Sequence, residues 1–169
     1  FVCYTKRMEF FSSLATTPSM DIFAKLSMAL LFGAILGLER VFAHRPAGPR
    51  TYALVSMGSA LFVIVADLAS KHYFNLGMNP DPLKMVGNII IGIGFLGAGI
   101  IIFKDSVLMG LTTAAGLWLA AGIGIASGFG LYVPAFLATV FTLFIFTVLY
   151  YVEVGLLHVH KDSPPPPDR

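Results

Sequence analysis

The sequence predicts an all-α fold, an integral membrane bundle of five transmembrane helices, on three observations. Of the 169 residues, 57% are hydrophobic and only 12% are charged, against roughly 25% charged residues in soluble proteins. The mean hydropathy is +0.83. Five separate apolar stretches approach the length of about 20 residues that a helix needs to cross a bilayer. So few charges cannot cover a soluble surface, which excludes a soluble enzyme, a disordered chain and a nucleic-acid-binding protein.

The five stretches are separated by short polar connections that explain where each one stops. Charged pairs end the first stretch at Glu39-Arg40 and the third at Lys104-Asp105. Prolines 46 and 49 prevent a helix between the first two stretches, and Asn-Pro-Asp-Pro at 79–82 marks a turn before the third. A Gly-Phe-Gly sequence separates the fourth and fifth. The predicted spans are 21–38, 51–69, 85–103, 111–127 and 132–152.

A β-barrel is the structural alternative, but its strands would alternate apolar and polar residues over about 10 positions. The five stretches are apolar all round and about twice as long, so helices are favoured. The spans form one domain, 21–152. We expect 1–20 to be a loose or interfacial extension and 153–169, with four consecutive prolines, to be a short cytosolic tail.

The distribution of basic residues predicts the orientation in the membrane. Arg40, Arg45 and Arg50 surround the first loop, where only Glu39 opposes them. Because loops rich in Lys and Arg stay in the cytosol, we expect this loop and the C-terminus inside and the N-terminus outside. The formal net charge of +2 is too small to indicate a polyanionic partner. We expect membrane lipid and another membrane protein, or a second copy, as partners and no nucleic acid.

Small residues recur at the spacing that lets membrane helices pack closely. The segment 92–97 matches the dinucleotide pattern GxGxxG, but it lies inside an apolar span and has no strand before it, so helix packing is the better interpretation. A GxxxG pair and a ridge of small residues occur in the first and fourth spans. The predicted packing glycines are Gly33, Gly37, Gly92, Gly94, Gly97, Gly99, Gly116, Gly124 and Gly128.

Besides Asp21 at its start, the predicted set of spans contains two charged residues, Lys25 and Asp67, and we also single out the polar Asn88. Charges inside a bilayer are costly, about 2.5–3.5 kcal/mol at the helix centre on insertion scales. Antiparallel packing of the first two helices would place Lys25 and Asp67 at nearly the same depth. We expect a salt bridge between the two, or side chains that snorkel to the interface, with an ion or proton site as the functional alternative. We expect Asn88 to make a packing hydrogen bond.

The cytosolic face carries the most polar group of residues. Thr51 is predicted to cap the second helix, and the hydroxyls of Thr112 and Thr113 to satisfy free N–H groups at the start of the fourth. Helix capping and membrane anchoring explain many of these residues, while an anion, a lipid headgroup or a protein partner is the functional alternative. The cluster is Glu39, Arg40, Arg45, Arg50, Thr51, Lys104, Asp105, Thr112 and Thr113.

Nothing in the sequence supports catalysis. No Ser-His-Asp or paired-carboxylate arrangement stands out, and the one cysteine, Cys3, permits neither an intramolecular disulfide nor a cysteine metal site. His158 and His160 are two residues apart, a spacing that does not share a helix face. We therefore expect no enzyme activity, no metal and no cofactor.

Four ordered motifs resemble the MgtC/SapB membrane family. They are GAILGLER at 33–40, PAGPRT at 46–51, GIGFLGAGI at 92–100 and GLTTAAGLW at 110–118. The similarity extends from about 21 to 152. Pro49 and Gly116 depart from the usual pattern. Some members carry a soluble domain after the fifth helix, where this chain has the proline-rich tail.

The resemblance implies a five-helix protein of the bacterial inner membrane, associated with adaptation to low magnesium. The family's charged motif positions correspond here to Glu39, Arg40, Arg50, Lys104 and Asp105. Two functions stay open on this basis. One is a non-enzymatic regulator of another membrane complex, and the other is an oligomeric transporter or channel for magnesium or protons. A transporter predicts a polar path from Asp67 and Asn88 to the cytosolic cluster, and a regulator predicts a sealed bundle.

Overall fold

The computed structural model describes residues 19–43, 45–78, 80–104 and 107–152, and these form a helical bundle. All five of the long helices in this described part are long and apolar enough to cross a membrane. They are α2 (Ser19–Phe42), α3 (Pro49–Phe74), α4 (Leu83–Ile100), α5 (Leu111–Gly128) and α6 (Tyr132–Phe144), the last continued by a π-helical turn, η1 (Ile145–Leu149). The prediction of an all-α membrane bundle is confirmed. The expected tail lies outside the described residues, and so does the expected extension apart from 19 and 20, which belong to α2.

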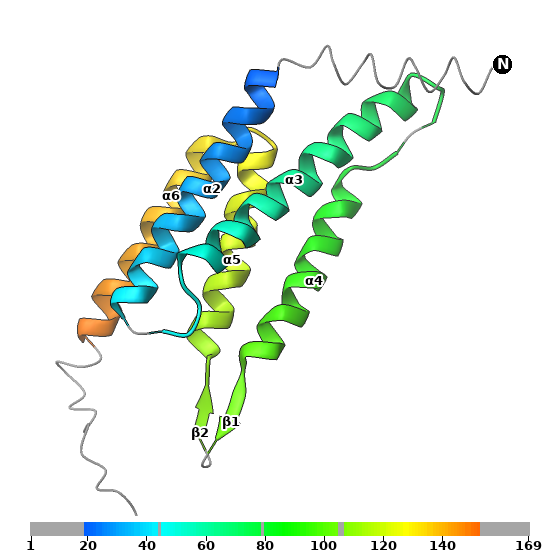
Figure 1. The fold of residues 1–169 in the computed structure, drawn as a ribbon. Coiled ribbons are helices and arrows are strands. Elements are labelled where there is room, and N and C mark those ends of the chain that lie inside the picture. The colour runs from blue at the N-terminus through cyan, green and yellow to red at the C-terminus, as the bar shows by residue number, and fades with distance from the viewer. Residues whose placement is uncertain (1–18, 44, 79, 105–106, 153–169) are drawn as a thin grey trace, which may run out of the picture.

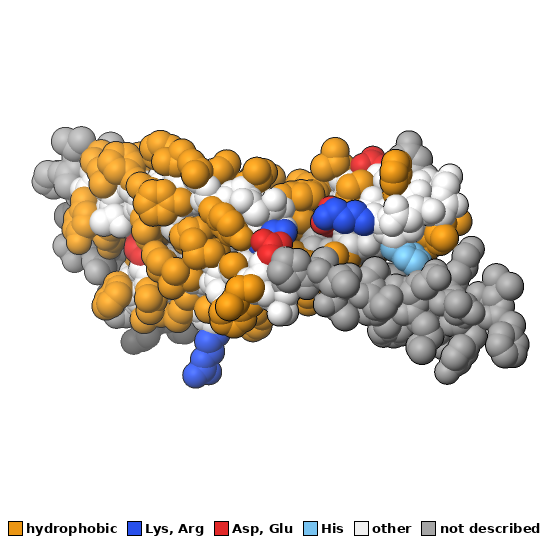
Figure 2. Space-filling model, turned by 90° about the horizontal axis from the view of Figure 1, so that it is seen from above, with side chains coloured by type: hydrophobic (Ala, Val, Ile, Leu, Met, Phe, Trp, Pro, Cys, Tyr) orange, Lys and Arg blue, Asp and Glu red, His pale blue; other side chains and the backbone are white. Residues whose placement is uncertain are grey.

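Helix α5 is the centre of the bundle. It contacts α2, α3, α4 and α6, and half of its span is buried, against 28% or less for each of the other spans. Helix α4 stands at the edge, against α5 and, more loosely, α3 (Figure 1). The outward faces of the helices are apolar, and hydrophobic side chains cover most of the bundle surface visible in Figure 2. Such a surface suits lipid rather than water.

Close backbone contact between α2, α3 and α5 depends on glycine. A Cβ atom added at Gly33 of α2 would lie 2.6 Å from the carbonyl oxygen of Tyr52, and one at Gly128 of α5 would lie 2.9 Å from that of Ala60. Added Cβ atoms would also collide at Gly37 with Pro49, at Gly116 with the Tyr52 hydroxyl and at Gly124 with the backbone of Ser56. All five of these glycines, which the sequence singled out for packing, thus lie where an added Cβ would collide with another part of the bundle.

Three of the four glycines of α4 that were predicted to pack closely face no neighbouring helix within the described chain. A Cβ atom added at Gly92, Gly94 or Gly99 would meet nothing within 4 Å. Only Gly97 faces a neighbouring helix, where an added Cβ would make an ordinary contact at 3.6 Å with Ala114 of α5. The physical reason is the edge position of α4, which leaves most of its circumference without a neighbour.

The third span is shorter than predicted because a hairpin replaces its last turn. Helix α4 ends at Ile100 rather than at 103, and strand β1 (Ile102–Lys104) pairs antiparallel with β2 (Val107–Met109). Gly110 joins the hairpin to α5 with φ +90°, and a Cβ there would collide with the carbonyl of Ile100. This left-handed, crowded position suits glycine alone. The hairpin projects beyond the helices at one end of the bundle (Figure 1).

Candidate functional site

The candidate site lies at the end of the bundle that holds Arg40, Arg45 and Arg50, here called the basic end. Helix α2 finishes there, α3 and α5 begin there, and the β1–β2 hairpin extends from it (Figure 1). Two regions distant in sequence, the α2–α3 connection and the hairpin with the start of α5, therefore meet at this end, and the predicted cluster residues that the structure describes are placed on them.

Arg40 is the most unusual residue of the basic end because its charge is buried. It sits in the last turn of α2 with 2% exposure, and its Nε donates to Oε2 of Glu39 in an ion pair. Its guanidinium carbon, Cζ, lies 3.5 Å from the centre of the Phe146 ring. A guanidinium over an aromatic face is stabilised by the electrons of the ring, most strongly where water is excluded. Arg40 thus links the end of α2 to the end of the last span.

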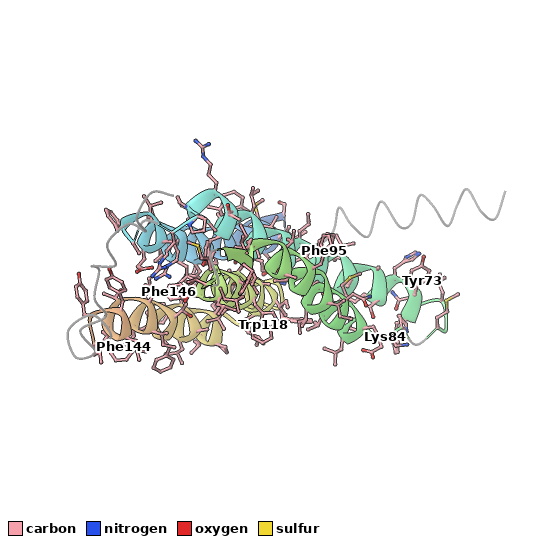
Figure 3. All side chains as sticks on the ribbon, turned by 90° about the horizontal axis from the view of Figure 1, so that it is seen from below. Tyr73, Lys84, Phe95, Trp118, Phe144 and Phe146 are labelled. Atoms are coloured by element: carbon pink, nitrogen blue, oxygen red, sulfur yellow. The ribbon has the colours of Figure 1, made fainter. Side chains whose placement is uncertain are left out.

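Phe146 reaches Arg40 from the π-helical turn η1. It is 7% exposed, whereas the nearby Phe144 is 56% exposed on the outside of the bundle (Figure 3). A π-helical turn changes the register of the side chains that follow it, and such turns are frequent at functional sites. Here the turn lies where a buried ring meets a buried charge.

Tyr52 ties α3 to α5 beside this pair. It is completely buried, and its hydroxyl donates a hydrogen bond of 3.4 Å to the carbonyl oxygen of Thr113. Tyr52 and Phe146 belong to the same apolar cluster, and an added Cβ at Gly116 would collide with both side chains. The glycine at 116, a departure from the family pattern, gives these two rings the room they occupy.

The other cluster residues lie on the surface of the basic end or line its cavity. Arg45, Arg50, Thr51 and Thr112 are exposed, whereas Thr113 is only 1% exposed. A cavity of about 640 Å³ is lined by Arg45, by Thr112 and Thr113, and by residues of the hairpin. The backbone of Lys104 pairs with Val107 in the hairpin. Asp105 lies outside the described residues.

Helix capping by the three threonines, as predicted, is wrong. The N-cap of α3 is Gly48 and that of α5 is Gly110, and neither helix start has a side-chain cap. Helix α3 begins at Pro49, so Thr51 already lies inside its first turn, where its N–H donates to the Gly48 carbonyl at 3.1 Å. The threonine hydroxyls are therefore left for other roles.

The predicted pairing of Lys25 with Asp67 is also wrong. Lys25 Nζ lies 2.8 Å from Asp21 Oδ2, and Asp67 Oδ2 lies 2.7 Å from Lys71 Nζ. Each charge therefore has a partner one turn away on its own helix: Asp21 stands at the start of the first predicted span, and Lys71 lies where α3 runs beyond the second. Pairs at this spacing are neighbours on a helix surface and form without any contact between helices.

Asn88 lies on the exposed side of α4 rather than in the packed interior. It lines a groove of about 580 Å³ between α3 and α4, together with mainly apolar residues. The expected packing hydrogen bond is absent for this side chain among the described residues. Asn88 and Asp67 thus do not share a site, and neither of them lies at the basic end.

Sequence reasoning missed three residues that the structure makes prominent. Tyr52 and Phe146 look like ordinary members of apolar spans, although a tyrosine directly after the arginine-rich loop was a usable signal. Ser56 is fully buried where α2, α3 and α5 meet, and its hydroxyl has no hydrogen-bond partner in the described part of the chain. Nothing in the sequence distinguishes it from other serines.

No group of three or more metal-ligating side chains occurs among the residues that the structure describes. His158 and His160 fall outside them. The donors at the basic end are guanidinium groups, hydroxyls and backbone N–H groups. Such groups bind anions and acidic side chains rather than cations.

The order of the motifs and the five-helix bundle agree with a family-level comparison. The model of the MgtC family matches residues 26–154, most of the chain. The chain belongs to the MgtC family. Every helix of the bundle lies wholly or largely within this matched region.

Curated relatives carry MgtC family names. Protein SapB of Bacillus subtilis is 40% identical over 56% of this chain and 42% of its own length. Protein MgtC of Brucella abortus is 42% identical over 58% of this chain and 38% of its own. The Escherichia coli protein named putative magnesium transporter YhiD is 34% identical over 82% of this chain and 65% of its own length. The matched region is thus less than two thirds of each relative's length. No solved structure matches the chain.

Proposed function

We propose that this MgtC family protein is a non-enzymatic regulator in the bacterial inner membrane. It contributes to adaptation to low magnesium by docking another membrane protein through its basic end, which faces the cytosol. Membership in the MgtC family is established above, and the regulatory role is the proposal. The partner is a membrane protein that presents acidic or anionic groups, because the basic end offers arginines and hydrogen-bond donors.

The observation that carries this proposal is the sealed contact between α2, α3 and α5. At Gly33, Gly124 and Gly128 the helix backbones lie so close that even one added carbon would collide. A path for ions through a helical bundle needs water-filled space between the helices. The contact between these three helices leaves no such space.

The buried hydroxyls of the bundle support the same conclusion. The hydroxyls of Ser59, Ser127, Thr139 and Thr142 each donate to the carbonyl four residues earlier on their own helix. They therefore satisfy themselves locally and do not form a chain of donors between helices. The path that a transporter would need from Asp67 and Asn88 to the basic end has no support among the described residues.

Transport is the second candidate function, and one observation favours it. The curated Escherichia coli relative bears the name putative magnesium transporter. For this chain, transport would have to use a pathway formed between copies, because the interior of one copy is closed at its glycine contacts.

A growth assay tests the docking role. Arg50→Ala removes an exposed arginine of the basic end, and it is expected to abolish growth support in low magnesium in a bacterium that lacks its own family member. Lys84→Ala is the matched control, since Lys84 is an exposed cation on the first turn of α4, at the opposite end of the bundle. Membrane abundance of both variants, measured by immunoblot, should stay within about twofold of the parent.

Two further measurements separate regulation from transport. Purification in mild detergent should recover a co-purifying membrane protein with the parent and much less of it with Arg50→Ala. Magnesium uptake into proteoliposomes that contain the purified chain should not exceed that of empty liposomes. Normal growth of Arg50→Ala, or magnesium uptake by the parent alone, would refute the regulatory proposal.

A further inference from the structure

The cavity at the basic end has the chemistry of an anion site. Its lining comes from three parts of the fold: the α2–α3 loop with Arg45, the hairpin, and the start of α5 with Leu111, Thr112 and Thr113. Among the described residues that line it, none carries a carboxylate. The polar groups that line it are donors or hydroxyls, so an occupant must supply acceptors.

The start of α5 supplies backbone donors. The first backbone bond of this helix runs from Ala114 N–H to the Gly110 carbonyl, at 2.9 Å. The N–H groups of Leu111, Thr112 and Thr113 have no acceptor among the described residues, and Gly110 offers no side-chain cap. Free N–H groups at the positive end of an 18-residue helix favour a bound anion.

Thr113 gives an independent indication of a ligand. The residue is 1% exposed and lines the cavity, and no hydrogen bond between its hydroxyl and another described residue is seen. Buried hydroxyls in native proteins are nearly always paired. Its backbone carbonyl is already used by Tyr52, which holds this turn of α5 in place while the hydroxyl stays available.

Arg45 completes the set with a full positive charge. It is exposed and lines the same cavity. A guanidinium, a hydroxyl and several N–H groups that converge on one space match an anion with several acceptor oxygens. The hairpin adds exposed apolar side chains to the same lining, with Ile102 at 59% and Leu108 at 54% exposure.

We propose that this cavity binds a phosphate group, carried by a membrane phospholipid headgroup or present as free phosphate. The inference deepens the proposed function and rests on it in one respect, since it assigns a ligand to the same basic end. Phosphate binding is measured on the purified chain and the docking role by growth in low magnesium, so either proposal can fail while the other stands.

Binding of inorganic phosphate to the purified full chain in detergent, followed by calorimetric titration, is the first arm. Retention of phosphatidylglycerol by the same protein, followed by native mass spectrometry, is the second. Whichever of the two ligands the site binds, inorganic phosphate or phosphatidylglycerol, Arg45→Gln is expected to weaken its binding at least fivefold. Thr113→Val keeps the shape of the buried side chain and should weaken it similarly. Lys84→Gln, which removes the same charge at the other end, should change it less than twofold.

The two arms identify the source of the phosphate. Arg45-dependent binding of inorganic phosphate alone assigns free phosphate, and Arg45-dependent retention of the lipid assigns a headgroup. The site is overturned if Arg45→Gln binds like the parent in both arms. It is also overturned if Arg50→Gln, on the same end but outside the cavity lining, weakens binding as much as Arg45→Gln, because that result means a diffuse basic surface. Arg45 is exposed, so its variant tests the site even if Thr113→Val fails to fold.

Discussion

Glycine residues with similar sequence surroundings do opposite things in this chain. Gly124 of α5 lies against the backbone of Ser56, so any side chain there must displace α3. Gly92 of α4 has open space where its Cβ would be. Both belong to motifs of small residues in apolar helices, and the sequence offers no rule that separates them. What separates them is whether a neighbouring helix occupies that side.

The contrast predicts opposite effects of the same substitution. Gly124→Ala should lower the stability of the bundle by about 1–3 kcal/mol, because overpacking forces helices apart. Gly92→Ala should leave stability unchanged or raise it by up to about 1 kcal/mol, because alanine favours a helix and nothing is displaced. Thermal unfolding of the purified variants in detergent measures both. Equal destabilisation by the two substitutions would contradict the described position of α4.

At the scale of helices, the ends matter more than the centres. Helices α2 and α3 each run beyond their predicted spans, and the extension of α3 supplies Lys71 to Asp67. Lys25 pairs with Asp21, the first residue of its predicted span. Depth in the bilayer alone suggested a contact between the two helices. Local partners one turn away prevail because they need no alignment of two separate helices.

A double-mutant cycle tests this assignment. Lys25→Ala and Asp67→Ala should have additive effects on stability, with a coupling below about 0.5 kcal/mol, since groups without a shared partner act independently. Exposed pairs on one helix contribute about 0.3–0.5 kcal/mol, so Asp67→Ala with Lys71→Ala should show a small favourable coupling instead. Thermal unfolding of the three single variants, the two double variants and the parent gives both values. A larger coupling between positions 25 and 67 would indicate that these two residues form a salt bridge between the helices after all.

An element can be predicted from sequence when local composition determines it, and not when it depends on contacts with distant residues. Five apolar stretches suffice to predict five spans, because a bilayer demands that length and hydrophobicity. The hairpin was missed because Ile102 and Phe103 are as apolar as the helix before them, and two three-residue strands leave no periodicity to detect. The basic cluster was predictable from charge. The burial of Arg40 was not, because it depends on Phe146, more than a hundred residues away.

For the whole molecule, the described ends of the bundle differ in charge and in chemistry. The basic end holds the arginines of the α2–α3 loop, and the opposite end holds the loop between α3 and α4. Because basic loops stay in the cytosol, the basic end is expected inside the cell and the α3–α4 loop outside.

Cysteine accessibility tests the orientation in a Cys3→Ser background, which has no cysteine of its own. Met78→Cys, in the α3–α4 loop, should react with a membrane-impermeant maleimide in intact cells. Pro46→Cys, in the α2–α3 loop, should react only after permeabilisation. Both positions are exposed, so low reactivity cannot be ascribed to burial. Labelling of Pro46→Cys alone in intact cells would reverse the orientation.

The edge position of α4 also has a consequence for assembly. Membrane helices insert one by one and then associate through packing, so the helix with the least buried surface gains least from association. Only 11% of the α4 span is buried, against half of α5. We therefore expect helix α4 to be the last to join the bundle and the first to separate when detergent loosens it. The bundle of α2, α3, α5 and α6 stays together while the groove beside α4 widens, a partial opening at a lower free energy than complete unfolding.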